Sequence, residues 1–144
     1  MANADNPATG ASFEETVRRF FSARGLPLES NHSVAVGAGS ERRPRRFDLG
    51  CANPPTLVEC KCHTWTRGGN APSAKLSVWN EAMFYFLVAP SQYRKILAVL
   101  AHTRGSQSIA EHYVTRFRHL VPPGVEIWEV SLDGKVGRAV FIGS

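Results

Sequence analysis

The chain has 144 residues, of which 43% are hydrophobic and 20% charged, and this balance favours one globular domain over a disordered chain. Its formal net charge of +5 is a mild indication of a polyanionic partner, because lysines and arginines neutralise phosphates. No apolar run is long enough to span a membrane, the N-terminus lacks an export signal, and three cysteines do not indicate a disulfide framework. A cytoplasmic protein is therefore expected.

One helix is predicted near the start of the chain. Residues 1–10 are small and polar and are expected to be flexible, whereas residues 11–144 are expected to form a single domain. Ser12 is the predicted N-cap, and Glu15 completes a capping box with it. Apolar residues at helical spacing then continue the helix until Gly25: Phe13, Val17, Phe20 and Phe21.

Three strands are predicted next, and two turns separate them. A basic turn at 37–46 joins the first two, and an Asn-Pro-Pro turn at 53–55 joins the last two. The predicted strands are residues 31–37, 46–52 and 56–65.

The second half of the chain alternates helices and strands. After a loop at 66–75, the helix predicted at 74–89 is apolar on most faces, so we expect it to be buried between layers. Its large side chains are expected in the core: Trp79, Met83, Phe84, Tyr85 and Phe86. The remaining elements are a strand at 94–102, a helix at 106–120, and strands at 125–131 and 136–143. The order predicts an α/β domain with a mixed sheet.

Charged side chains interrupt the second and third strands. Strand alternation places Glu59, Lys61 and His63 on one face, while Cys60 and Cys62 join the opposite, apolar face. This separation leaves a Cys/His zinc site poorly supplied with ligands.

Antiparallel pairing around the turn at 53–55 would bring Asp48 beside Glu59. Two adjacent carboxylates repel each other unless a cation lies between them, and Mg²⁺ is a hard ion that prefers carboxylate oxygens. The ammonium group of Lys61 could orient a metal-bound water and offset charge in a phosphoryl transition state. The alternative is a structural ion pair of Lys61 with one of the acids.

These residues carry a family resemblance. The segment "FDLG", followed by "VECK" eleven residues after Asp48, resembles the D-x(n)-E-x-K motif of the PD-(D/E)xK nucleases, the restriction-endonuclease-like superfamily. The segment "GASFEETVRRFFSARG" resembles the first helix of its Holliday-junction-resolvase and Mrr-like branches, with matching positions Gly10, Glu14 and Gly25. Phe47 stands where the namesake motif has proline. The αβββαβ order is this superfamily's core, so the resemblance covers roughly residues 10–101.

The resemblance implies a metal-dependent endonuclease that cuts DNA, with RNA as an alternative substrate. Asp48 and Glu59 would be metal ligands, together with the backbone carbonyl of Cys60, and Lys61 would be the catalytic lysine. Glu14 would orient a ligand or a metal-bound water, although it also reads as a solvated residue of the first helical turn. The implied metal is Mg²⁺, with Mn²⁺ expected to substitute, and a homodimer would serve duplex cutting.

Basic residues near these strands are the candidate nucleic-acid contacts. The basic turn carries four arginines beside Asp48, although a solvated hairpin end is the alternative. The loop beside the site adds further candidates, and its Trp65 could contact bases or fold inwards. The candidate residues are Arg42, Arg43, Arg45, Arg46, His63, Arg67 and Lys75. The competing hypothesis for the whole chain is a nucleic-acid-binding protein of the same fold that does not cleave.

Overall fold

The computed structural model describes residues 7–144, with side chains from Gly10 onwards. Its helices are α1 (Pro7–Ser22), α2 (Ser73–Leu87) and α3 (Ile109–Phe117), and the 3₁₀ turn η2 (Arg118–Leu120) follows α3. Its longer strands are β1 (Glu29–Val36), β2 (Arg43–Ala52), β3 (Pro55–Lys61), β4 (Arg94–Leu100), β7 (Glu126–Val130) and β8 (Gly137–Ile142). Two short strands, β5 (Thr103–Arg104) and β6 (Gln107–Ser108), form a hairpin ahead of α3.

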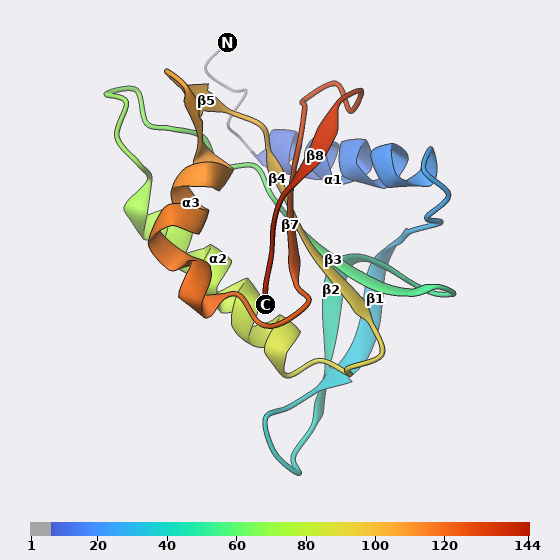
Figure 1. The fold of residues 1–144 in the computed structure, drawn as a ribbon. Coiled ribbons are helices and arrows are strands. Elements are labelled where there is room, and N and C mark those ends of the chain that lie inside the picture. The colour runs from blue at the N-terminus through green and yellow to red at the C-terminus, as the bar shows by residue number, and fades with distance from the viewer. Residues whose placement is uncertain (1–6) are drawn as a thin grey trace.

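The six longer strands form one mixed sheet in the order β1-β2-β3-β4-β7-β8. The three central strands are parallel to one another, and the outer strands are antiparallel to their neighbours. Helices α2 and α3 cover one face of the sheet and α1 covers the other (Figure 1). The predicted α/β class with a mixed sheet is confirmed. Within the described residues, no helix has the length and apolar character needed to cross a membrane.

Each face of the sheet has its own hydrophobic core. On β4, Leu97 and Val99 pack into the core under α2 and α3, whereas Ile96 and Ala98 pack into the core under α1. This division follows from the alternation of side chains along a strand. The parallel centre of the sheet is therefore buried on both sides.

Strand β2 changes face in its middle. Phe47 packs into the α2–α3 core, but Leu49, two residues later, packs into the α1 core. Strict alternation would place both on the same face. The paired residues of β2 and β3 run from Ala52 and Pro55 to Leu49 and Val58, and pairing ends there. Asp48 therefore lies where β2 both switches face and separates from β3.

The start of α1 differs from the prediction. The helix begins at Pro7, so Ser12 lies inside it, and the predicted capping box is wrong. Glu15 pairs instead with Arg18 at 2.6 Å, which is a local pair one helical turn along. Residues 7–10 of the predicted flexible segment belong to α1, and its residues 1–6 lie outside the described residues.

Helix α2 is more exposed than its sequence predicts. Trp79, Met83 and Phe86 are buried as expected, and Tyr85 is half-buried. Phe84 is 55% exposed, so its assignment to the core is wrong. The reason is that α2 lies on one face of the sheet, and no further layer of the described chain covers its outer side (Figure 1).

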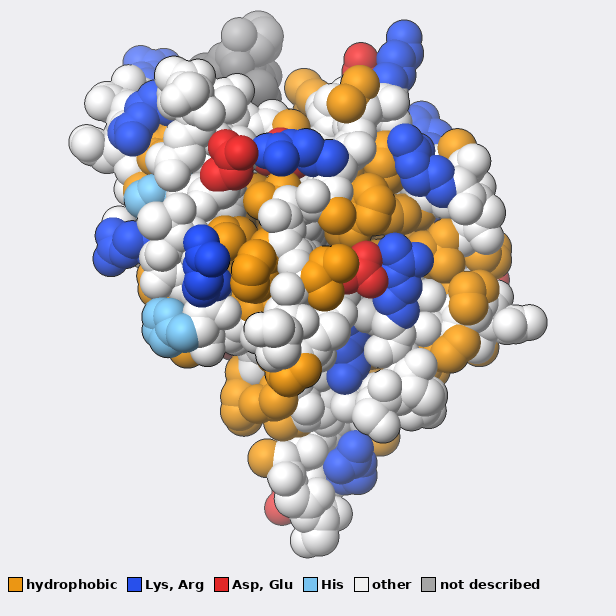
Figure 2. All heavy atoms as spheres, viewed as in Figure 1, with side chains coloured by type: hydrophobic (Ala, Val, Ile, Leu, Met, Phe, Trp, Pro, Cys, Tyr) orange, Lys and Arg blue, Asp and Glu red, His pale blue; other side chains and the backbone are white. Residues whose placement is uncertain are grey.

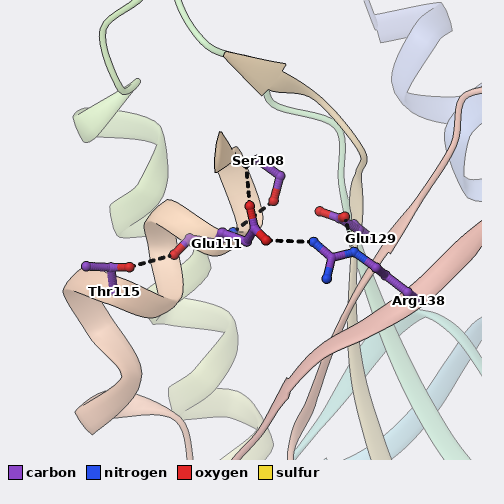
Figure 3. Close-up of polar contacts among 5 residues, drawn as sticks. All are labelled: Ser108, Glu111, Thr115, Glu129 and Arg138. Atoms are coloured by element: carbon purple, nitrogen blue, oxygen red, sulfur yellow. Dashed lines mark hydrogen bonds and ion pairs between the residues drawn. The ribbon is translucent and has the colours of Figure 1, made fainter. Parts of the chain in front are cut away.

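Helix α3 is fixed to the sheet by a polar network (Figure 3). Ser108 caps its N-terminus, in a capping box with Glu111. Arg138 on β8 bridges Glu111 at 2.9 Å and Glu129 on β7 at 2.6 Å. One side chain therefore joins the last helix to the last two strands.

Candidate active site

Asp48 and Glu59 lie together where β2 and β3 separate. The backbone N–H of Asp48 donates to Glu59 Oε2 at 3.0 Å, and the backbone N–H of Cys60 donates to Asp48 Oδ2 at 2.8 Å. Backbone pairing has ended at this point, so the two carboxylates satisfy N–H groups that the ladder leaves open. At this point the side chains of the two acids, and not backbone carbonyls, accept the hydrogen bonds that join β2 to β3.

The acids are held under electrostatic strain. Burial, followed by the charge of Asp48, raises the pKa of Glu59, whose side chain is only 5% exposed. Glu14 reaches the same place from α1, and burial, the charges of Asp48 and Glu59, and a hydrogen bond with Asp48 raise its pKa. The structure therefore brings together the three acids that the sequence selected.

Lys61 and Cys60 complete this group. Lys61 is half-buried, and its positive charge favours the ionised form of Glu59. Burial raises the pKa of the Cys60 thiol well above its usual value, so the thiol is protonated and unreactive. Its sulfur packs against the α1 core, as alternation predicts. Cys51 and Cys60 are free thiols.

The donor types in this group suit a hard divalent cation. Burial and the charge of Asp48 raise the pKa values of Glu59 and Glu14, and a positive ion among the three acids would relieve this repulsion. However, within the described residues no three Asp, Glu, His or Cys side chains are arranged to hold a metal. Both oxygens of Glu59 contact protein groups, because Arg45 Nη2 lies 3.4 Å from Oε1 and Asp48 N–H holds Oε2. The chemistry of the group fits Mg²⁺, while the ligand arrangement is incomplete.

Arg45 belongs to the site rather than to a turn. The structure extends β2 back to Arg43, so three of the four arginines predicted in the basic turn lie in a strand. The Arg45 guanidinium lies 3.8 Å from the centre of the Tyr85 ring and 4.8 Å from that of Phe47, next to Glu59. Stacking on two rings fixes it as the internal counter-ion of Glu59.

The other arginines of this hairpin are exposed. Arg43 pairs with Glu41 at 2.8 Å, and Arg42 donates to the carbonyl of Gly37. Arg46 is exposed on β2. Their candidacy as nucleic-acid contacts stays a prediction.

The remaining predicted contacts meet beyond the end of β3. His63, Arg67 and Lys75 line one pocket. Trp65 also lines it, but its indole is 5% exposed and donates to the carbonyl of His102, so the inward reading of this residue is confirmed. Nδ1 of His63 accepts a hydrogen bond from the indole N–H of Trp79 at 2.8 Å.

Sequence reasoning missed His102, and it named Arg45 as a candidate nucleic-acid contact without its ion pair to Glu59. Arg45 alternates with Phe47 along β2, and this spacing was a usable signal that both face α2. His102 follows β4, and the parallel pairing of β3 with β4 brings it beside the loop that follows β3. No local sequence pattern predicts that His102 lies in this region.

The chain was also compared with known proteins. No protein-family model, no curated protein and no solved structure matched it. The functional assignment therefore depends on residue geometry alone.

Proposed function

We propose that this protein is a metal-dependent nuclease that hydrolyses phosphodiester bonds in DNA. The observation that supports it best is the meeting of Glu14, Asp48, Glu59 and Lys61 at the point where β2 separates from β3. The αβββαβ order of the first six elements agrees with the restriction-endonuclease-like core that we propose for residues 10–101. A mixed sheet of this kind suits many functions, so the site is the stronger support.

Each residue has a proposed role. Asp48 and Glu59 would hold Mg²⁺, with the carbonyl of Cys60 as a further ligand. The ion would supply a water of lowered pKa and offset negative charge on the phosphate. Lys61 would orient that water and stabilise charge that develops in the transition state. The Glu14 carboxylate, which a hydrogen bond joins to Asp48, would accept a hydrogen bond from that water.

The candidate substrate surface lies around the C-terminal end of β3 and the N-terminal end of α2. The face formed by α3, β7 and β8 carries Lys and Arg side chains singly or beside acids, with hydrophobic side chains between them (Figure 2). Such a mixed surface is a poor match for a phosphate backbone. The pocket at the end of β3, by contrast, has Arg67 and Lys75 in its wall.

Plasmid cleavage tests the proposal. Wild-type protein should nick or linearise supercoiled DNA in Mg²⁺ or Mn²⁺ and not in EDTA. Asp48→Asn and Lys61→Met should each reduce cleavage by at least about 100-fold, because each removes a group that acts in the transition state. Lys135→Met, which removes an exposed ammonium group in the turn between β7 and β8, is the matched control for Lys61→Met. Cleavage in EDTA, or cleavage that survives both substitutions, would exclude this mechanism.

One observation favours a second function, that of a nucleic-acid-binding protein that does not cleave. Arg45 already neutralises Glu59, as a resident cation would in a site without metal. Salt-sensitive DNA binding with no cleavage in either Mg²⁺ or Mn²⁺ would support this alternative.

A further inference from the structure

A cavity of about 680 Å³ opens next to the proposed active site. It lies beyond the end of β3, between the loop at 62–72, the start of α2 and the end of β4. Arg67, Lys75 and two histidines contribute to its wall, Gly10 of α1 also lines it, and none of the described residues there is acidic. Its charge therefore favours an anion.

Hydrogen bonds hold the two histidines in the same tautomer. Nδ1 of His63 accepts from the indole N–H of Trp79 at 2.8 Å, and Nδ1 of His102 accepts from the backbone N–H of Trp65 at 3.1 Å. A neutral imidazole that accepts at Nδ1 carries its proton on Nε2. In each ring the Nε2–H is thus the remaining donor, and no described residue accepts it.

This arrangement distinguishes an anion site from a metal site. Binding a cation through Nε2 would require that proton to leave and the hydrogen bond at Nδ1 to break. Burial, Lys75 and Lys61 also lower the pKa of His63, which keeps its ring neutral near pH 7. Two Nε2–H donors beside two cations are suited to the oxygens of a phosphate.

The position of the cavity ties its ligand to the active site. His63 follows Lys61 by two residues, a chain length of at most about 7 Å. A phosphate in the cavity would therefore belong to the same strand as a phosphate beside Lys61. The cavity is also large enough for a sugar and base.

We propose that this cavity binds the phosphodiester adjacent to the one that is cut, through the Nε2–H groups of His63 and His102 and the ammonium group of Lys75. This inference rests on the proposed nuclease function and adds its substrate class. The substrate is a strand with a nucleotide unit free to enter a pocket, as in single-stranded or frayed DNA. His63 and His102 select for phosphate through shape and hydrogen bonding, while Lys75 supplies charge.

The test uses full-length protein carrying Asp48→Asn, in EDTA, so that binding is measured without cleavage. The probes are inorganic phosphate, the mononucleotide dTMP and the dinucleotide dTpdT, each titrated while the ¹⁵N resonances of the histidine rings are followed by NMR. We expect dTpdT to shift the Nε2 resonances of His63 and His102 together, with saturation. Inorganic phosphate and dTMP should bind more weakly, because each lacks the internal diester with its two flanking sugars.

Matched amide substitutions separate the donor from the structural contact. His63→Asn and His102→Asn keep an acceptor near the Nδ1 position and remove the Nε2 donor, whereas His63→Gln and His102→Gln place an amide N–H near Nε2. We expect each Asn variant to weaken dTpdT binding about tenfold, and each Gln variant to bind within about threefold of the parent. The melting temperature of each variant identifies any that fails to fold, and the ring shifts in the parent protein then still decide the question.

Several results would overturn the proposal. These are the absence of a shift at both histidines with every probe, Asn variants that bind as well as the parent, dTMP binding without dTpdT binding, or inorganic phosphate binding as tightly as dTpdT. Cleavage is measured separately in the wild type. Cleavage without these shifts would refute the cavity alone, and shifts without cleavage in Mg²⁺ or Mn²⁺ would refute the nuclease alone.

Discussion

Asp48 combines two interactions that can be separated by substitution. Its carboxylate accepts the N–H of Cys60, and its negative charge raises the pKa values of Glu59 and Glu14. The first interaction stabilises the sheet, because a buried N–H without an acceptor is costly. The second opposes folding, because it places like charges together in a poorly solvated site.

We predict that Asp48→Asn stabilises the protein at pH 7. The amide oxygen can still accept from Cys60, while the repulsion of Glu59 disappears. The expected gain is on the order of 1 kcal/mol, or about 3 °C in melting temperature. Asp48→Ala, which removes the acceptor as well, should be less stable than the Asn variant by about 1–2 kcal/mol. Thermal unfolding of both variants measures this, and an Asn variant less stable than wild type at pH 7 would contradict it.

The gain should depend on pH in a defined direction. Folding raises the pKa of Glu59 above its ordinary value of 4.5, so the folded state binds this proton more tightly than the unfolded state does. The corresponding stability is fully present below pH 4.5 and is lost as the pH rises through the raised pKa. Asp48→Asn reduces the shift, so its advantage over wild type should shrink as the pH falls towards 4.5. Melting temperatures measured between about pH 4 and pH 8 test this trend.

At the scale of elements, Gly50 allows β1 and β3 to approach β2 closely. A Cβ at this position would lie 2.6 Å from Cβ of His32 and 2.8 Å from the carbonyl oxygen of Thr56. The carbonyl belongs to the backbone of β3 and cannot turn aside. A side chain here would therefore push β3 away from β2, next to the acids.

Gly50→Ala should destabilise the protein by about 1–3 kcal/mol, as overpacking in a rigid core does. Denaturant unfolding measures the change. Gly39→Ala in the β1–β2 turn is the control, because no described atom lies within 4 Å of the place that a Cβ would take there, and the expected change is within about 0.5 kcal/mol. Equal effects at the two glycines would show that packing at Gly50 is not the cause.

The sequence predicts most of these elements because their periodicity is local. Short apolar runs mark β3 and β4, and turn residues mark their ends. The start of α1 was missed because a Ser-x-x-Glu pattern also occurs inside helices, where Glu15 pairs with Arg18. The β5–β6 hairpin was missed because two-residue strands have no period to detect. The face switch of β2 at Asp48 breaks the alternation rule itself.

The whole molecule consists of two cores that share one sheet, and the candidate site lies between them. Glu14 comes from the α1 side, whereas Arg45 packs on Tyr85 of α2. Alternation and the turn at 53–55 were enough to predict that Asp48, Glu59 and Lys61 converge. The contact of His102 with Trp65 could not be predicted, because it joins segments that only the folded sheet brings together.

Arg138 lies on β8, the last strand of the sheet, away from the candidate site. Its guanidinium pairs with Glu129, which is 8% exposed and has one buried oxygen without a described partner. Arg138→Met should destabilise the protein by roughly 1–2 kcal/mol, because Glu129 would then be a buried charge without its cation, while the half-exposed arginine limits the loss. In a Glu129→Gln background the same substitution should cost clearly less. A double-mutant cycle by denaturant unfolding measures the coupling, and additive effects would contradict it.

The hydrogen bonds that Asp48 and Glu59 accept between β2 and β3 would constrain which residues stay at these positions if the protein lost its cleavage activity. Positions 48 and 59 must present acceptors to backbone N–H groups whether or not the protein cuts DNA. Lys61 forms no such hydrogen bond to backbone among the described residues. Natural variants that had abandoned catalysis would be expected to keep oxygen-bearing side chains at 48 and 59 and to drift at 61. Position 61 is therefore the more discriminating marker of an active protein than the two acids.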